Sequence, residues 1–340
     1  MCAKACQYDA IQNYHRPCEQ ACAVKAISMD EYKLAVIDDE KCIQCGHCVS
    51  QCPFGAIMDK SYITHVIKLL KKADKDNPVY AIVAPSIATQ FESRGSVKQI
   101  VSALKELGFA KVFEAALGAD MVSYNESREL IEKGFLLSSC CPAFVNLIEK
   151  NYPKLVEHVS HNLSPMATIG KWVKDKEPNA HMIFIGPCIA KKQEIKRDDV
   201  KDIIDYVLTF EELQALIDAR EIDVSGLKES ALDDASYYGR IFARSGGLTE
   251  AVRQAIKEMN SEFVLKPMSA DGLENCRLAL VKAQRDEKEF NFLEGMACIG
   301  GCIGGPACLN HELKDRMTMD KYAGQSKKES IDEATDGYTH

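Results

Sequence analysis

The pattern of hydrophobic and polar positions changes at about residue 60. Beyond that point, residues 62–77 have the spacing of an amphipathic helix, and the apolar run 79–83 is typical of a buried strand. The two patterns then alternate. We expect further helices over 97–107, 119–133, 166–176, 210–219 and 247–259, and strands over 111–115, 181–185 and 205–209. This alternation predicts an α/β body with largely parallel sheets.

Composition excludes several classes of protein. The 340 residues are 46% hydrophobic and 27% charged, with a formal net charge of −8, which does not favour a nucleic-acid partner. No apolar run approaches the roughly 20 residues of a membrane span. The first residues, MCAKACQYD, lack the basic and apolar regions of a secretory signal. We therefore expect no membrane association and a cytoplasmic location.

The cysteines carry most of the chemical information. There are 15, of which eight fall in the first 52 residues and none lies between Cys52 and Cys140. A long chain without an export signal is unlike a disulfide-rich secreted domain, so metal binding is the better interpretation.

One motif near the N-terminus is highly specific. Residues 42–53 read CIQCGHCVSQCP, the C-x2-C-x2-C-x3-C-P run that binds [4Fe–4S] clusters, whereas zinc sites use paired C-x2-C knuckles. In this run three thiolates hold one cube and the fourth serves a second. His15 and His47 are polar neighbours in this interpretation rather than ligands.

The other early cysteines complete a repeat. CAKACQYDAI, CEQACAVKAI and CVSQCPFGAI share one spacing, which indicates a ferredoxin-like α+β unit with two cubes over residues 1–60. We assign Cys22, Cys42, Cys45 and Cys48 to one cube, and Cys2, Cys6, Cys18 and Cys52 to the other. Gln7 and Ala23 depart from the proline expected after a closing cysteine.

Residues 61–340 form the second unit, in which 325–340 are polar and expected to fray. Ligands in α/β folds lie beyond the carboxyl ends of strands, and three cysteine motifs fall in such loops. These motifs contribute Cys141, Cys188, Cys298 and Cys302, which can converge on a further [4Fe–4S] cube. The last two stand in the glycine-rich run EGMACIGGCIGGPAC, and glycine lets a backbone approach a metal group closely.

Cys140 stands next to the predicted ligand Cys141 and is not itself assigned to a cube. Adjacent cysteines do not easily bind the same cube, so Cys140 either packs in the core or carries a proton. The residues alone leave both interpretations open. Cys276 and Cys308 belong to no motif and are expected to be buried thiols.

Three long motifs together resemble the signatures of [FeFe] hydrogenases: SSCCPAF at 138–144, PCIAKKQE at 187–194 and EGMACIGGC at 294–302. The resemblance covers essentially the whole chain. It implies a two-lobed catalytic domain carrying the H-cluster, a [4Fe–4S] cube joined through a cysteine to a two-iron unit with CO, cyanide and a bridging azadithiolate. It further implies the reversible reduction of protons to H2, an oxidoreductase activity of the ferredoxin type, and an anaerobic way of life.

The resemblance also implies roles for individual residues. Cys141, Cys188, Cys298 and Cys302 hold the cube, with Cys302 as the bridge. Lys191 and Ser86 each serve a cyanide, Met296 lies against the two-iron unit, and Cys140 donates protons to the bridging amine. Ala84, Pro85 and Pro187 are expected to line the cofactor. The relay behind Cys140 is expected to include Glu126, Glu129, Ser160 and Glu194, although Glu126 and Glu129 taken alone read as solvated helix residues.

Other features of the resemblance concern partners and rivals. A ferredoxin-like protein is the expected electron partner, and maturation proteins deliver the two-iron unit. Gly186, Met166, Phe144 and the GGPAC segment depart from the commonest family pattern and resemble a less-studied branch. The rival functions are an H2 sensor, an iron–sulfur scaffold without fast turnover and, less compatible with the large body, a plain electron-transfer protein.

Overall fold

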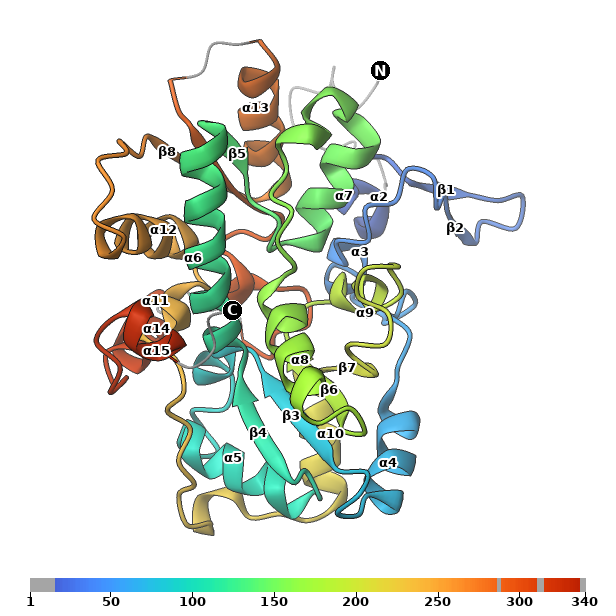
Figure 1. Cartoon of the computed structure of the whole chain (residues 1–340). Coiled ribbons are helices and arrows are strands. Elements are labelled where there is room, and N and C mark those ends of the chain that lie inside the picture. Colours follow the sequence, from blue (N-terminus) through green and yellow to red (C-terminus); the bar gives the residue numbers. More distant parts are fainter. Residues whose placement is uncertain (1–15, 286–288, 311–314, 337–340) are drawn as a thin grey trace.

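The computed structural model describes residues 16–285, 289–310 and 315–336 (Figure 1). They form two parallel sheets with surrounding helices and a small N-terminal unit with an antiparallel hairpin. The α/β class with largely parallel sheets, preceded by a small α+β unit, is thereby confirmed. None of the helices in these ranges has the length and apolar content needed to span a bilayer.

The larger sheet has the strand order β4-β3-β6-β7, with every pair parallel. Its strands are β3 (Val79–Val83), β4 (Lys111–Glu114), β6 (His181–Gly186) and β7 (Tyr206–Thr209). Every residue of β3 is buried, as its uninterrupted apolar sequence requires in a sheet covered on both faces. The helices packed around this sheet are α4 (Ile63–Lys72), α5 (Val97–Glu106), α8 (Pro165–Lys176) and α10 (Phe210–Ala219).

The smaller sheet has the order β5-β9-β8, also parallel. It comprises β5 (Leu136–Leu137), β8 (Pro267–Asp271) and β9 (Phe292–Met296), with α7 (Pro142–Asn151), α12 (Gly247–Glu258) and α13 (Leu273–Gln284) packed against it. The sequence patterns missed β8 and β9. In β9 the buried Glu294 interrupts the apolar pattern, and it is tolerated because its carboxylate accepts the backbone N–H groups of Gly246 and Thr249 at 2.7 and 2.9 Å.

Helix α6 (Ala115–Lys133) links the two sheets and runs between them (Figure 1). It starts directly after β4, four residues earlier than the predicted helix at 119, because Glu114 is the last residue with extended backbone. Gly118 allows α6 to touch α8, since a Cβ atom there would lie 2.1 Å from the carbonyl oxygen of Pro165. This contact fixes the start of the helix beside the loops of the larger sheet.

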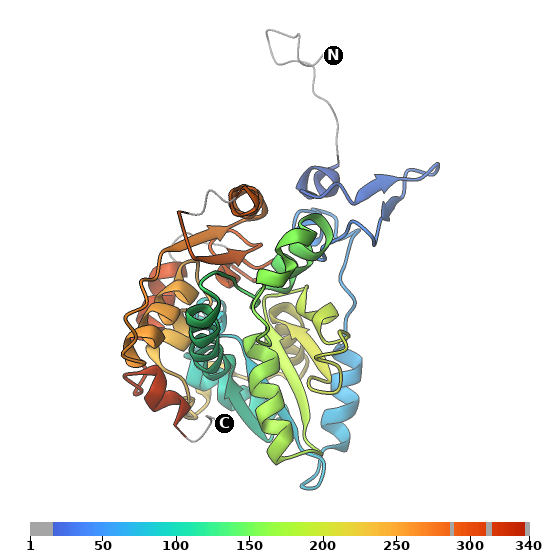
Figure 2. The same cartoon turned by 45° about the horizontal axis from the view of Figure 1, so that its top comes forward.

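The N-terminal unit contains α2 (Pro17–Ala21), the hairpin β1 (Ile27–Met29) and β2 (Ala35–Ile37), and α3 (His47–Ser50). The hairpin register pairs Ile27 with Ile37. Both views place this unit at one end of the molecule, next to α7, with the hairpin projecting away from the body (Figures 1 and 2).

Two further predicted segments differ from the structure. Helix α4 ends at Lys72 rather than at residue 77, because the Asp74 carboxylate accepts the N–H groups of Asp76 and Asn77 and forms a turn. The expectation of a frayed tail over 325–340 is wrong for α15 (Ile331–Thr335): Ser330 caps it, and Ile331 is fully buried against α6 and α12. Residues 337–340 lie outside the described ranges.

The remaining short elements are η1 (Pro85–Thr89), η2 (Pro153–His158), α9 (Lys191–Glu194), η3 (Val224–Gly226), α11 (Tyr237–Ile241), η4 (Cys302–Gly304) and α14 (Asp315–Ala323).

Candidate active site

A cavity lies where the loops of the two sheets meet, and it contains about 760 Å³ of space not filled by protein atoms. The loops after β3, β5, β6 and β9 all contribute to its wall, so it occupies the carboxyl-end position at which parallel sheets bind ligands. Five cysteines line it: Cys140, Cys141, Cys188, Cys298 and Cys302.

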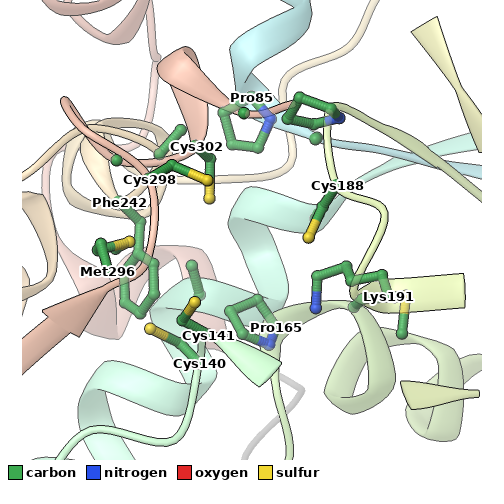
Figure 3. Close-up of a pocket in the computed structure, with 18 of the residues that line it drawn as sticks. Pro85, Cys140, Cys141, Pro165, Cys188, Lys191, Phe242, Met296, Cys298 and Cys302 are labelled. Carbon is green, nitrogen blue, oxygen red and sulfur yellow. The ribbon is translucent and has the colours of Figure 1, made fainter. Parts of the chain in front are cut away.

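Four of these thiols face a shared space. Figure 3 shows Cys298 and Cys302 on one side, Cys188 on a second side and Cys141 on a third, with Cys140 beside Cys141. Burial raises the pKa of Cys188 to about 11 and the pKa values of Cys298 and Cys302 further still. Mutual repulsion among the thiolates adds to the effect. Without a metal these buried groups would be neutral thiols, and thiolates would be stable together in this cavity only with a positively charged metal group between them.

The arrangement suits a cluster rather than a single ion. Within the described ranges, no three Cys, His, Asp or Glu side chains are close enough to hold one metal ion. In a [4Fe–4S] cube each thiolate binds a different iron, so the sulfurs surround the cluster instead of converging on one point. Zinc would require that convergence.

The remaining wall is mostly apolar. Pro85, Pro165, Phe184, Phe242 and Met296 lie around the thiols, and such a lining excludes water from whatever the cavity holds. The predicted lining residues Ala84, Pro85 and Pro187 are all part of this wall.

One cation enters the apolar wall. The Lys191 side chain is 10% exposed, and its Nζ atom donates to Glu194 Oε2 at 2.8 Å and to Ser164 Oγ at 3.1 Å. Although burial opposes a charge here, the Glu194 carboxylate raises the pKa of Lys191 above its ordinary value. Lys191 therefore presents a held positive charge at the cavity, as Figure 3 shows.

A second polar group is unpaired. Ser86 in η1 is fully buried, and its Oγ atom has no hydrogen-bond partner among the described residues. A buried hydroxyl without a partner is costly, so a ligand is its natural explanation. Ser86 itself follows the wall residue Pro85 rather than lining the cavity. The buried ammonium and the four thiols fit a metal group that carries small anionic ligands, and the unpaired Ser86 hydroxyl belongs to the residue next to a wall residue of the same cavity.

The glycines of residues 294–308 mainly allow neighbouring loops to pack closely together. Gly301 has φ +86°, and a Cβ atom there would lie 2.7 Å from the Ser245 nitrogen. A Cβ atom at Gly305 would lie 2.6 Å from the carbonyl oxygen of Pro187. Their absence of side chains thus lets the loop of Cys302 pack against two neighbouring loops, in addition to the predicted approach to a metal group.

Cys140 stands at the inner end of a polar chain. Its side chain is buried, and burial followed by the Glu126 carboxylate raises the pKa of its thiol well above the ordinary value. Glu126 is fully buried, and burial raises its pKa to about 7 although Ser139 lowers it through a backbone N–H bond of 3.2 Å to Oε1. The second oxygen, Oε2, has no partner in the described part of the chain.

The outer end of this chain reaches solvent through Glu129. Ser160 Oγ donates to Glu129 Oε2 at 3.1 Å, and Ser160 is also close enough to Glu126 to lower its pKa. Lys133 and His161 flank Glu129 with bonds of 2.6 and 2.8 Å. Burial works to raise the pKa of Glu129, but these partners, Lys133 first, bring it below the ordinary value. The structure therefore brings together four predicted relay residues: Cys140, Glu126, Ser160 and Glu129.

Two polar residues of this row of hydrogen-bonded groups were not predicted, and one predicted residue has another partner. Ser139 binds Glu126, and Asn162 Nδ2 donates to Glu129 at 3.0 Å. Ser139 could have been found from its place next to Cys140 in SSCC, whereas nothing in the sequence marks Asn162. Glu194, predicted as a relay residue, instead binds Lys191 and has no bond to the other relay residues in the described ranges.

The N-terminal cysteines form a second site. Cys22, Cys42, Cys45 and Cys48 line one pocket, and burial raises the pKa of Cys45 to about 12 with further contributions from the other three thiolates. These are the four residues assigned to one cube. Cys18 is buried in α2, while Cys52 is half-buried and its thiol accepts the Ala56 N–H at 3.3 Å. Cys2, Cys6 and His15 lie outside the described residues, so the second accessory cube stays a prediction.

The two unassigned cysteines are buried, as predicted. Cys276 is fully buried and its thiol lies 3.4 Å from the carbonyl oxygens of Ala270 and Met296. Cys308 is 6% exposed and its thiol donates to the Ile303 carbonyl at 3.3 Å. His47 is only partly buried, and its buried Nδ1 has no partner among the described residues.

These features define a protein with a buried, thiol-lined cavity and a second cysteine-lined pocket, both suited to iron–sulfur clusters. Comparison with protein families identifies it further. The C-terminal domain of the iron only hydrogenase large subunit matches residues 77–306, and a 4Fe-4S binding domain matches residues 35–58. The chain belongs to the iron-only [FeFe] hydrogenase family.

Individual relatives are distant. The NADP-reducing hydrogenase subunit HndD of Solidesulfovibrio fructosivorans is 28% identical over 85% of this chain, which spans 60% of the length of that protein. Iron hydrogenase 1 of Clostridium pasteurianum is 29% identical, with 85% of this chain and 67% of that protein covered. Protein NAR1 of Arabidopsis thaliana is 25% identical over 85% of this chain and 74% of its own length.

Solved structures share the fold. A variant of the apo [FeFe]-hydrogenase HydA1 from Chlamydomonas reinhardtii superimposes with a TM-score of 0.67. The match covers 82% of this chain and 95% of that chain, at 21% sequence identity.

Proposed function

We propose that this protein is an [FeFe] hydrogenase that catalyses the reversible reduction of protons to H2. The observation that carries the proposal is a buried chain of proton-carrying groups that ends at the thiol-lined cavity. It runs from Glu129 through Ser160 and Glu126 to Cys140. A protein that only stored or transferred electrons would have no use for such a chain.

The cavity residues would hold the H-cluster in defined ways. Cys141, Cys188, Cys298 and Cys302 would bind its cube, while Lys191 and Ser86 would donate hydrogen bonds to its cyanide ligands. When bound, the cofactor supplies the Lewis-acid iron and the neighbouring base that cleaving or forming H2 requires. Glu194 keeps Lys191 charged and oriented, and the apolar wall keeps water out.

The protein's own task is to move protons. The raised pKa of the Cys140 thiol keeps it neutral, so Sγ can donate a proton at the cavity wall. Glu126, with a pKa of about 7, can both accept and release a proton near neutral pH. Ser160 and Glu129 carry protons onward to the surface beside Lys133 and His161.

Electrons would enter through the N-terminal unit. Cys45 is near enough to Cys298 for its thiolate to raise the pKa of Cys298, which supports a short step between the two cluster sites. A ferredoxin-like protein is the proposed partner outside the chain, and maturation proteins are proposed to deliver the two-iron unit. The cytoplasmic location, the ferredoxin-type classification and the second accessory cube, with Cys2, Cys6, Cys18 and Cys52, remain proposals.

A second candidate is an iron–sulfur scaffold or sensor. The scaffold is favoured by the likeness to the cytosolic Fe-S cluster assembly factor narfl of Xenopus tropicalis, which is 24% identical over 84% of this chain. Such a protein would need the cubes but neither a proton relay nor Lys191. The presence of both Lys191 and Cys140, the inner end of the relay, in the wall of one cavity makes the hydrogenase the better proposal.

The test is H2 production by anaerobically matured protein supplied with a chemical reductant. We expect Cys140→Ala to lower turnover by a factor of about 10²–10⁴, because it removes the innermost proton donor. Cys276→Ala is the matched control, since it removes another buried thiol and should leave turnover close to wild type. Normal turnover in the Cys140 variant would exclude the relay, and no turnover in the wild-type protein would favour the scaffold.

A further inference from the structure

Two helices connect the cavity to the accessory cluster site, and each begins at or close to a cavity cysteine. Cys141 is the N-terminal cap of α7, and Cys188 lies three residues before α9. Both helices also hold the N-terminal unit (Figure 1). The two cluster sites are therefore joined through short, defined pieces of structure.

Helix α7 holds the loop that carries Cys42 and Cys45. Lys150 Nζ donates to the carbonyl oxygens of Asp39 and Cys42, each at 2.8 Å. Asn146 Nδ2 donates to the carbonyl oxygen of Ile43 at 3.1 Å. The Ile43 side chain is only 1% exposed, and it packs in the same apolar cluster as residues of α7. The loop is thus bound by its backbone, which fixes its position and orientation.

Helix α9 holds the chain that leaves the N-terminal unit. Lys192 is 3% exposed, and its Nζ atom contacts Asp59 Oδ2 at 2.5 Å, Glu212 Oε2 at 2.8 Å and the Lys60 carbonyl oxygen at 3.1 Å. Glu212 Oε1 accepts the Ser61 hydroxyl and the Tyr62 N–H. Four successive residues, 59–62, are therefore bound by only two side chains of the catalytic body.

The two adjacent lysines of α9 contact different parts of the molecule. Lys191 points to the cavity, whereas Lys192 points to the segment 59–62. Between these two points of attachment, the loop of the accessory cysteines touches the loops of the cavity directly. Gly46 has φ +80°, and a Cβ atom there would lie 2.8 Å from both Ile189 Cδ1 and Pro306 Cγ. Ile189 follows Cys188, so any movement of the accessory loop away from α9 opens the path between the clusters.

We propose that Lys150 and Lys192 form a two-point clamp that fixes the accessory cluster against the cavity cluster and so sets the rate at which electrons pass between them. The proposal rests on the proposed cluster content of the two sites. In the step concerned, the accessory cube loses one electron and the cavity cube gains it. The electron comes from an external reductant. Both lysines are positioning residues: Lys192 lines the pocket of the accessory cysteines, but the Nζ atoms of both lysines bind carbonyl and carboxylate oxygens of the chain.

The clamp is tested by the magnetic interaction between the two reduced cubes, measured by electron paramagnetic resonance in dithionite-reduced protein without the two-iron unit. In the double variant Lys150→Met, Lys192→Met we expect this interaction to weaken and rapid-mixing reduction of the cavity cube to slow severalfold. Each cube should keep its own spectrum. When Lys150→Arg takes the place of Lys150→Met, the coupling should largely return, because the longer arginine side chain can still reach the two carbonyl oxygens.

Lys201→Met is the matched control. Lys201 is exposed and pairs with Asp198, so its removal should change neither quantity. Unchanged coupling and reduction rate in the double variant would overturn the clamp. Loss of the accessory cube in either single variant would also overturn it, since the lysines would then support the cluster-binding fold itself rather than its position.

The two proposals fail in different ways. The magnetic coupling needs only the cubes, so a protein that never takes up the two-iron unit can still show the clamp. Conversely, a hydrogenase whose coupling is unchanged in the double variant would keep its proposed function and lose only the clamp.

Discussion

The two cluster sites of this molecule are built in contrasting ways. In the N-terminal site, three of the four grouped cysteines come from one run of seven residues, Cys42 to Cys48, and their side chains are partly exposed. In the cavity, four cysteines come from three loops at the ends of β5, β6 and β9, in two different sheets. The first site is a local feature of the chain, and the second exists only when the whole body has folded.

This difference explains where chemistry is placed. A local motif can hold a cluster close to the surface, where electrons enter, with few demands on the rest of the chain. A site assembled from distant loops can surround its cofactor with apolar walls and aim a held charge and the proposed proton relay at it. The cost is dependence on every loop contact, including those made possible by Gly301 and Gly305.

The largest expected effect comes from removing one ligand in each site. Cys188→Ala should lower bound iron by about four atoms per chain and abolish H2 production, while the accessory spectrum survives. Cys45→Ala should instead remove the accessory signal and leave the cavity cube in place. Iron analysis with electron paramagnetic resonance separates the two. If Cys188→Ala also removed the accessory cube, the sites would not be independent structures.

A smaller effect is expected from backbone substitutions. Gly301→Ala should destabilise the protein by about 2–4 kcal/mol, because the positive φ and the contact with Ser245 both oppose a Cβ atom. Gly55→Ala, in the N-terminal unit, should cost only about 1 kcal/mol, since its φ is +60° but nothing lies within 4 Å of the added atom. Anaerobic denaturant titration measures both. Equal losses would show that the cavity loops are not closely packed.

The smallest expected effect is a difference in pH dependence. The pKa of Glu126 is raised to about 7, so the folded state binds its proton more tightly than the unfolded state does. The stability that this gives is complete below about pH 4.5 and is lost as pH rises through about 7. Between pH 5.5 and 7.5 we expect wild-type stability to fall by about 1–3 kcal/mol more than that of Glu126→Gln.

The exposed Asp38 of the N-terminal unit provides the contrast. Its pKa is lowered by Lys41, so its contribution has the opposite sign: it is present above the ordinary aspartate pKa and lost at lower pH. Between pH 5.5 and 7.5 the stability of Asp38→Asn should therefore follow that of wild type, whereas that of Glu126→Gln deviates. Asp38→Asn should deviate, with the opposite sign, only when the denaturant titrations are extended below about pH 4. Parallel curves for Glu126→Gln and wild type would contradict a protonated, buried Glu126.

The same contrast governs what could be predicted from the sequence. Local patterns gave β3 and α10 with the observed bounds and predicted the grouping of Cys22 with Cys42, Cys45 and Cys48. Motif resemblance placed five cysteines in one cavity. Patterns failed where long-range contacts decide: β9 contains a buried glutamate held by distant N–H groups, and α15 lies in a polar segment but buries Ile331, Ala334 and Thr335.

Roles that depend on three-dimensional neighbours were also beyond the sequence. Glu194 stays a predicted relay residue, but the structure adds a bond to Lys191 that depends on the turn of the short helix α9 and that no motif marks. Asn162 joins Glu129 from a loop that no motif marks. Lys192 reads as an ordinary surface lysine and is almost completely buried among carboxylates of two other segments.

The central claim is that the four cavity thiols hold a cube extended by a two-iron unit beside Lys191 and Cys140. The most direct measurement is the infrared spectrum of protein reconstituted with iron and sulfide and then treated with a synthetic two-iron cofactor. We predict sharp CO and cyanide stretching bands, with the cyanide bands shifted in Lys191→Met. A spectrum without such bands, from protein that holds its full content of cubes, would contradict the claim.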